Sequence, residues 1–194
     1  MKATLYLQSE VRAAGGRLIR RTRRRPSRSL VRAYLQHLRS AFAPVSEADV
    51  VDTGGVARTI RTPAAATTNW MQASISSDDS GILWGTGNAP VDISDYALGA
   101  LITDGAGAGQ LNYGAQAISA LATTGFDVQF TQQRVATNNS GASIIVREVG
   151  IACITQDTVP ATRYFLLARD MEDPGLTVLP GATITTTYTW VITE

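Results

Sequence analysis

The sequence contains one cysteine and one histidine, and this scarcity removes several classes of function. A single cysteine, Cys153, cannot form an internal disulfide, so the fold depends on packing alone. One cysteine and one histidine are too few for a zinc site built from nitrogen and sulfur ligands. Cys153 lies in the alternating apolar stretch VGIACIT, which predicts a buried thiol rather than a nucleophile. His37 would need partners from distant parts of the chain to act as a catalytic base.

Long apolar runs and charged residues are also scarce. No run approaches the ~20 apolar residues of a membrane-spanning helix, and the apolar pieces before the basic cluster are too short for a secretory signal. Charged residues make up only 17% of the 194 residues, whereas typical soluble domains contain roughly 25%. Because threonine, serine, alanine and glycine are abundant, this composition favours a β-rich protein with a polar but uncharged surface. We expect no membrane partner.

The charge that is present is distributed unevenly. Residues 1–42 contain Lys2, ten arginines and a single acid, Glu10, and carry a net charge of +10. Residues 43–194 contain six arginines and fifteen acids and carry a net charge of −9, so the formal total of +1 conceals a strongly dipolar chain. Such an asymmetry predicts a basic arm attached to an acidic body. The arm of one copy could therefore rest on the body of another.

A helical pattern follows Pro26, within the basic segment. Apolar residues recur at offsets of three, four and seven, which predicts an amphipathic helix of about three to four turns. Ser27 or Ser29 could cap this helix. We therefore assign residues 1–45 to an arginine-rich arm that ends in an amphipathic helix. The helix face that we expect to pack against a partner consists of Leu30, Val31, Tyr34, Leu35, Leu38 and Phe42.

From Val50 onward the apolar residues recur with a period of two, and Gly, Pro and Asn turns separate the runs. The stretch FDVQFTQQRVAT places Phe126, Val128 and Phe130 on one face of a predicted strand. In the final stretch, TITTTYTWVITE, apolar and aromatic residues share one face and threonines fill most of the other. Several strands with little helix between them predict a mainly β fold for residues 46–194, namely a jelly-roll-like antiparallel β-sandwich.

No group of residues has the pattern of a catalytic or metal site. Asp78 and Asp79 could bind calcium, but the spacing of an EF-hand is absent and a solvated turn is the better interpretation. Asp92 and Asp95 could form the carboxylate pair of a glycosidase, although nearby acids are common. The loop GAGAG lacks the lysine of a phosphate-binding loop. We therefore expect a protein that is not an enzyme and that has no catalytic residue, cofactor or metal.

The sharpest functional signal is the stretch from Arg17 to Leu38, which contains eight arginines. Arginine forms bidentate contacts with phosphate and carboxylate, so the partner could be a DNA backbone or an acidic protein surface. Binding to a membrane surface and mitochondrial targeting also fit a basic amphipathic segment. The scarcity of aromatics among the arginines argues against stacking on single strands. The residues that we expect to contact an anionic partner are Arg17, Arg20, Arg21, Arg23, Arg24, Arg25 and Arg28.

Several segments between about Val50 and the C-terminus carry a resemblance to known proteins. GTGNAPVDISDYAL, GQLNYG, TNNSGASIIVREVGI, YFLLARD and TVLPGATITTTYTW resemble stretches of small virion structural proteins of tailed bacteriophages. The resemblance implies a virion setting. Our first hypothesis for that setting is a non-enzymatic structural protein: a tail, neck or baseplate component, or a minor or decoration capsid protein. Its partners would be other copies of itself and other virion proteins, bound through the N-terminal arm, with packaged DNA as an additional partner of the arm.

Carbohydrate binding is the alternative function, in a module on a phage particle that recognises a host receptor. The candidate stacking residues are Trp70, Trp84, Tyr96 and Tyr113, although Trp84 and Tyr113 lie in alternating apolar patterns that predict core positions. A glycan-degrading enzyme that uses Asp92 or Asp95 is a third hypothesis, and the absence of any clear catalytic constellation argues against it.

Overall fold

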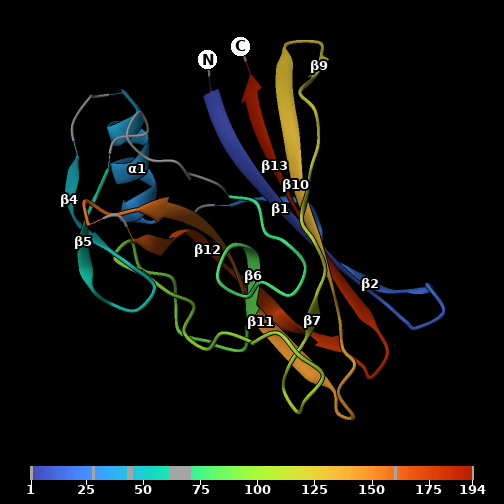
Figure 1. Cartoon of the computed structure of the whole chain (residues 1–194). Helices are drawn as coiled ribbons and strands as arrows, with labels where there is room; N and C mark the ends of the chain where they lie inside the picture. The colour runs from blue at the N-terminus through green and yellow to red at the C-terminus, as the bar shows by residue number, and fades with distance from the viewer. Residues whose placement is uncertain (1, 28, 43–45, 62–70, 160, 194) are drawn as a thin grey trace.

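The computed structural model describes residues 2–27, 29–42, 46–61, 71–159 and 161–193, which form thirteen strands and one helix (Figure 1). The structure is mainly β with antiparallel sheets, as predicted. The elements are β1 (Lys2–Arg12), β2 (Leu18–Arg21), β3 (Arg25–Pro26), α1 (Arg32–Phe42), β4 (Glu47–Val51), β5 (Ala57–Ile60), β6 (Gly81–Gly85), β7 (Asn112–Tyr113), β8 (Ala117–Ile118), β9 (Ala122–Thr124), β10 (Asp127–Thr137), β11 (Ile144–Gln156), β12 (Thr162–Val178) and β13 (Thr183–Thr193).

The larger sheet has eight strands and is built around β1, β13 and β10. β1 pairs antiparallel with β13 along its whole length, from Lys2 opposite Thr193 to Arg12 opposite Thr183. β10 pairs antiparallel with the other side of β13. The two ends of the chain therefore lie side by side in one sheet (Figure 1).

The structure corrects the start of the predicted arm. Residues 2–12 are not part of a separate arm, because they form β1 and pair with the last strand of the body. Leu5, Leu7 and Val11 of this strand are buried in the core that both sheets share. A division of the chain into an arm over residues 1–45 and a body over residues 46–194 therefore cuts through the large sheet.

The smaller sheet has three strands in the order β12-β11-β6. Its central strand, β11, is buried on both faces. Residues 148–153 are all buried, so side chains on both of its faces are covered. Val149 and Ile151 lie in the core shared with the large sheet, and Cys153 packs in a second core with residues of α1, β4 and β5. Burial on both faces explains why this strand is an almost continuous apolar run, while β1 and β13 alternate.

The alternation predicted for the final strand is confirmed over most of β13. Ile184, Thr186 and Tyr188 are fully buried, and the intervening threonines are partly exposed. Near the C-terminus the same face becomes accessible: Trp190 is only partly buried and Ile192 is 48% exposed. The end of the large sheet that holds both chain termini extends beyond the small sheet (Figure 1). We call the face with Leu7 and Tyr188 the inner face and the opposite face the outer face.

The predicted helix forms, and the face that it buries within the chain is not the face that we expect to pack against a partner. α1 packs against β12 and β4 through Ala33, His37 and Ser40, which are all buried. Leu35 and Leu38 of the predicted apolar face are instead 62% and 39% exposed. The buried face is built from small and polar side chains because His37 and Ser40 satisfy their polar atoms on carbonyl oxygens of the helix itself.

His37 and Cys153 form a buried pair between α1 and β11. The imidazole Nδ1 lies 2.8 Å from the carbonyl oxygen of Ala33, and Nε2 lies 3.4 Å from the thiol sulfur. Burial lowers the pKa of His37, against the opposing effect of the hydrogen bond to Ala33. Burial also raises the pKa of Cys153 to about 12. Both side chains are therefore neutral at pH 7, and the thiol is a packing residue, in agreement with the predicted buried thiol.

The lowered pKa of His37 makes the folded state sensitive to acid. The unfolded state binds the proton more tightly than the folded state does, so this contribution to stability is complete above the unfolded pKa of ~6.5 and is lost as the pH falls below it. We expect the free energy of unfolding in urea to fall between about pH 6.5 and pH 5 more steeply for the natural protein than for His37→Gln. Equal slopes for the two proteins would contradict the assignment.

Candidate functional site

A buried polar cluster fastens the end of the basic segment to β12. Asp170 and Glu172 are each only 3% exposed. Asp170 accepts hydrogen bonds from the hydroxyls of Ser27, at 2.8 Å, and Ser29, at 2.7 Å. It also accepts one from Tyr188, at 3.0 Å. Ser27 and Ser29 thus bind a carboxylate of the body and do not cap α1 as predicted.

The guanidinium of Arg25 completes this cluster. It donates to Glu172 Oε2 at 3.2 Å and lies 3.9 Å from Asp170 Oδ1. Burial raises the pKa of Tyr188, and the neighbouring carboxylate of Asp170 raises it further. The basic segment and the acidic body therefore contact each other within one chain, which the sequence left open.

Strand alternation divides the other predicted arginines between two faces. Arg20 lies opposite the buried Val11 and donates to the carbonyl oxygens of Gly175, at 3.2 Å, and Pro174, at 3.4 Å. Arg21 lies opposite Glu10, on the outer face. Arg20 and Arg25 thus serve the fold, which reduces the set of arginines that can contact a partner.

The arginines on the outer face surround one acid. Glu10 accepts from Arg12 Nε at 3.0 Å and from Arg21 Nε at 2.9 Å. Burial raises the pKa of Glu10, but the two guanidinium groups outweigh burial and hold the pKa below its ordinary value. Arg24 stacks over the ring of Tyr6, with 4.2 Å between its Cζ and the ring centroid. Glu10 is therefore fully ionised at pH 7, and Arg24 is positioned by a cation–π contact.

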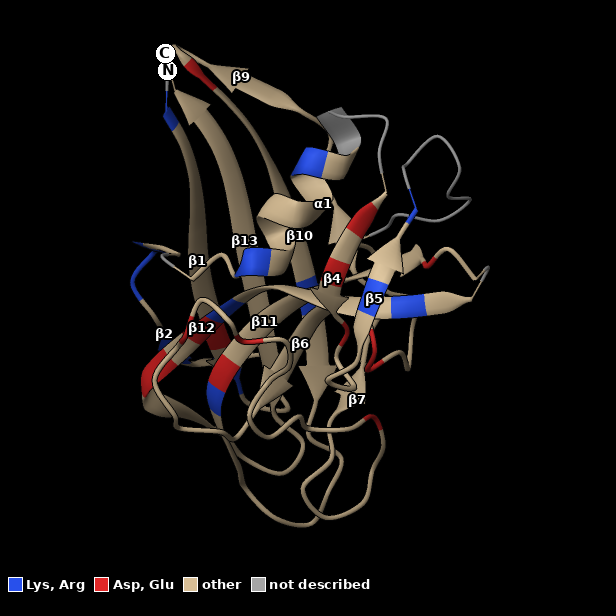
Figure 2. Cartoon of the chain, turned by 90° about the vertical axis from the view of Figure 1, so that its left-hand side faces the viewer, with Lys and Arg blue, Asp and Glu red and all other residues tan. Residues whose placement is uncertain are grey.

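Two of the predicted arginines, Arg17 and Arg23, are exposed, and their side chains make no hydrogen bond or ion pair within the described part of the chain. Arg28 lies outside the described residues. Figure 2 shows the basic residues of the β1–β2 hairpin at one edge of the large sheet, beside the acids of β12. We call Arg12, Arg17, Arg21, Arg23 and Arg24 the basic edge.

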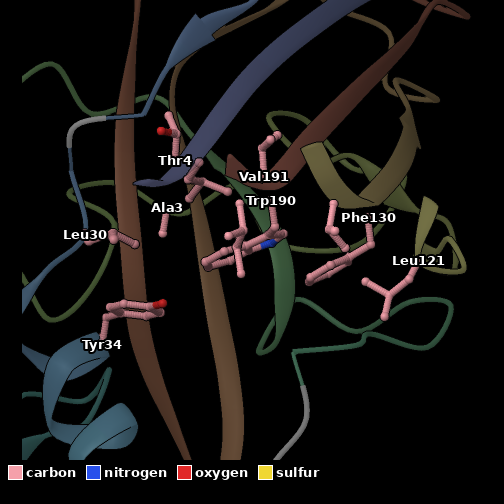
Figure 3. A pocket seen from close by; sticks show the side chains of 11 residues that line it. Ala3, Thr4, Leu30, Tyr34, Leu121, Phe130, Trp190 and Val191 are labelled. Atoms are coloured by element: carbon pink, nitrogen blue, oxygen red, sulfur yellow. The ribbon is translucent and has the colours of Figure 1, made fainter. Parts of the chain in front are cut away.

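An apolar groove lies on the inner face of the large sheet, at the end that the small sheet leaves uncovered (Figure 3). The rings of Phe130 and Trp190 stack at 6.1 Å between centroids, and Tyr34 of α1 stacks on Trp190 at 5.9 Å. The indole nitrogen of Trp190 donates to Gln132 at 2.9 Å. The cavity measures about 230 Å³, and its wall includes Leu30, Tyr34, Leu121, Phe130, Trp190 and Ile192.

The groove brings together part of the predicted helix face. Leu30 and Tyr34 line it, Val31 is buried in the second core, and Leu35 and Leu38 lie exposed on α1. The side chain of Phe42 lies outside the described residues. Phe130 and Trp190 were recognised only as members of strand faces. The sequence signal that could have identified the groove is that β10 and β13 stay apolar on this face up to their ends, at Val128 and Ile192.

The remaining candidate residues have structural roles. Asp78 accepts from the backbone nitrogen of Asp104 at 2.8 Å. Asp92 accepts from the backbone nitrogen of Ser94, and Asp95 binds Arg169 at 2.9 Å. Across the described residues no group of three or more His, Cys, Asp or Glu side chains could hold a metal ion.

The sequence also missed the role of Arg169, which is only 2% exposed and binds the fully buried Glu148 at 2.7 Å. Glu148 accepts in addition from the backbone nitrogens of Gly87, Gly99 and Ala100, and so fixes the loop that carries Asp95. Strand alternation alone does not reveal a buried ion pair of this kind.

Of the four stacking residues considered for carbohydrate binding, Trp84 and Tyr113 are buried, at 0% and 1% exposure. Trp70 lies outside the described residues, and Tyr96 is 44% exposed.

Comparison of the chain with models of known protein families, with curated proteins and with solved structures finds no match. Within the described residues, no helix has both the length and the apolar character to span a membrane.

The buried cluster predicts a large stability loss when its carboxylate is removed. Asp170→Ala deprives the hydroxyls of Ser27, Ser29 and Tyr188 of their acceptor and removes the carboxylate that lies 3.9 Å from Arg25, so we expect the free energy of unfolding to fall by about 2–4 kcal/mol. Asp79→Ala, which removes an exposed acid, should change it by less than about 0.5 kcal/mol. Urea unfolding at pH 7 measures both. A small effect of Asp170→Ala would show that the cluster does not hold the basic segment.

Proposed function

We propose that this protein is a non-enzymatic structural subunit of a bacteriophage virion and that it associates with other copies of itself, or with neighbouring virion proteins, through its apolar groove. The observation that carries the association is the groove in which Tyr34, Trp190 and Phe130 stack and whose wall includes the exposed Leu121 and Ile192. Contiguous exposed apolar surface of this kind marks interaction sites. The virion setting is supported by the sequence resemblance.

The edge of β1 supports the same proposal. β3 pairs with Tyr6 and Leu7, and β2 pairs with Glu10 to Arg12. No described strand pairs with this edge over Lys2–Thr4, next to the groove. An open edge beside an apolar groove can accept a strand of another subunit. That strand would pair with the edge of β1 and cover the groove with its apolar side chains. In this proposal the two sheets pack as the predicted jelly-roll-like sandwich, and the N-terminal residues contribute to assembly as part of the groove wall.

For the position within the particle we propose the same two alternatives as the sequence analysis: a tail, neck or baseplate component, or a minor or decoration capsid protein. Carbohydrate binding has less support than association, because two of the four candidate stacking residues, Trp84 and Tyr113, are buried in the core. The aromatic rings of the groove stack on one another and line an apolar wall, whereas the more exposed Tyr96 and Phe126 lie outside that wall.

Substitutions in the groove test the proposal. Leu121 and Ile192 are 73% and 48% exposed, so Leu121→Asp with Ile192→Asp should leave the fold intact and abolish association. Because the contact is apolar, association of the natural protein should persist at high salt. Sedimentation and negative-stain imaging report the assembly, and circular dichroism reports the fold.

Matched changes elsewhere provide the control. Ile93 and Val159 are 69% and 72% exposed, and Ile93→Asp with Val159→Asp adds the same charge outside the groove wall. This variant should associate normally. A natural protein that stays monomeric at all concentrations, or two variants that behave alike, would overturn the proposal.

A further inference from the structure

The outer face of the large sheet has an unusual composition next to the basic edge. On β1 it carries Tyr6, Gln8 and Glu10, whose neighbours along the strand are buried on the inner face. The residues opposite them on β13 are Thr189, Thr187 and Thr185. This part of the face therefore presents hydroxyl and amide groups.

The next strand continues the pattern. On β10, Thr131 and Gln133 lie opposite Thr189 and Thr187, and Gln133 Nε2 donates to the Thr187 hydroxyl at 3.0 Å. Across these three strands, the acids of the described outer face are Glu10, which Arg12 and Arg21 neutralise, and Asp127 at the far end of β10. A threonine- and glutamine-rich face therefore adjoins a row of arginines and has little negative charge to repel an anion.

The acids of the body do not balance the basic edge. Seven of its fifteen acids are in ion pairs with arginines outside the edge: Glu47 with Arg39, Asp52 with Arg58, Asp157 with Arg163, Asp95 and Glu148 with Arg169, and Asp170 and Glu172 with Arg25. Three more, Asp78, Asp92 and Asp104, accept hydrogen bonds from backbone nitrogens. A neighbouring copy would present these seven carboxylates in the same pairs, and its other described acids form no cluster of three or more that could hold a metal ion. Charge complementarity therefore favours a partner that brings dense, unpaired negative charge.

We infer that the basic edge and the adjoining outer face bind the phosphate backbone of duplex nucleic acid, without reading its base sequence. Duplex DNA carries one charge per ~1.7 Å of axis, and arginine, threonine and glutamine side chains supply most contacts to its phosphates. The described outer face offers a broad sheet and no helix that could enter a major groove, so the contact is made to the backbone. This surface lies opposite the apolar groove, and the inference does not rest on the proposed function.

Binding of the full chain to a mixed-sequence duplex of about 20 base pairs, followed by fluorescence anisotropy over a salt series, tests the inference. The affinity should fall linearly with salt on logarithmic axes. Arg21→Gln with Arg24→Gln should weaken binding about tenfold or more near 0.1 M salt and reduce the slope by roughly 1.8, since two phosphate contacts are lost. Arg17→Gln, at an exposed position of the hairpin turn, should reduce the slope by about 0.9.

The matched control is Arg32→Gln with Arg61→Gln, which removes two charges from α1 and from the residue after β5. It should bind with the natural slope, and a second duplex of different base composition should bind equally well. Absence of binding at low salt, or an equal loss in the test and control variants, would overturn the inference. Binding of poly-glutamate as tightly as DNA would also overturn it and would identify an acidic protein as the partner.

Discussion

The antiparallel ladder between β1 and β13 joins the eleven residues of one strand to the eleven of the other, at opposite ends of the chain. Closing a loop of this size costs about 4–5 kcal/mol in chain entropy. Burial of the Leu5, Leu7 and Val11 side chains offsets part of that cost. β1 itself is therefore held by its pairing with β13 and by its apolar side chains, and the positions of the groove and of the basic edge follow from this pairing.

Because β1 is fixed, the side chains of the hairpin that follows it are fixed as well. Successive residues of a strand point to opposite faces, so Arg20 is directed towards β12 and Arg21 towards the outer face. A run of arginines that looks uniform in the sequence thus contains some residues that bind the body and others that are exposed to solvent. Arg20 and Arg25 fasten the segment to the body, and their neighbours remain available to solvent.

The features that could be predicted from the sequence are those that depend on near neighbours. The alternation of β13, the existence of α1 and the burial of Cys153 follow from local patterns and are confirmed. The pairing of β1 was not predictable from its own residues, because its partner lies at the other end of the chain. The face that α1 buries within the chain was not predictable for a related reason. Within the chain α1 buries the small or polar side chains Ala33, His37 and Ser40 against β12 and β4. Apolar periodicity alone does not reveal that two of the larger leucines, Leu35 and Leu38, are exposed.

The groove was beyond sequence reasoning because a strand face does not reveal what covers it. Tyr188 and Trp190 belong to the same face of β13, yet Tyr188 is fully buried under the small sheet and Trp190 is accessible. The formal net charge of +1 likewise does not show how the charged side chains are distributed over the surface. Most ion-paired carboxylates are buried among the body residues, whereas the arginines of the basic edge are at the surface. A charge at the surface interacts with solutes far more than one that is paired within the protein, so an approaching molecule meets a cationic edge on a nearly neutral chain.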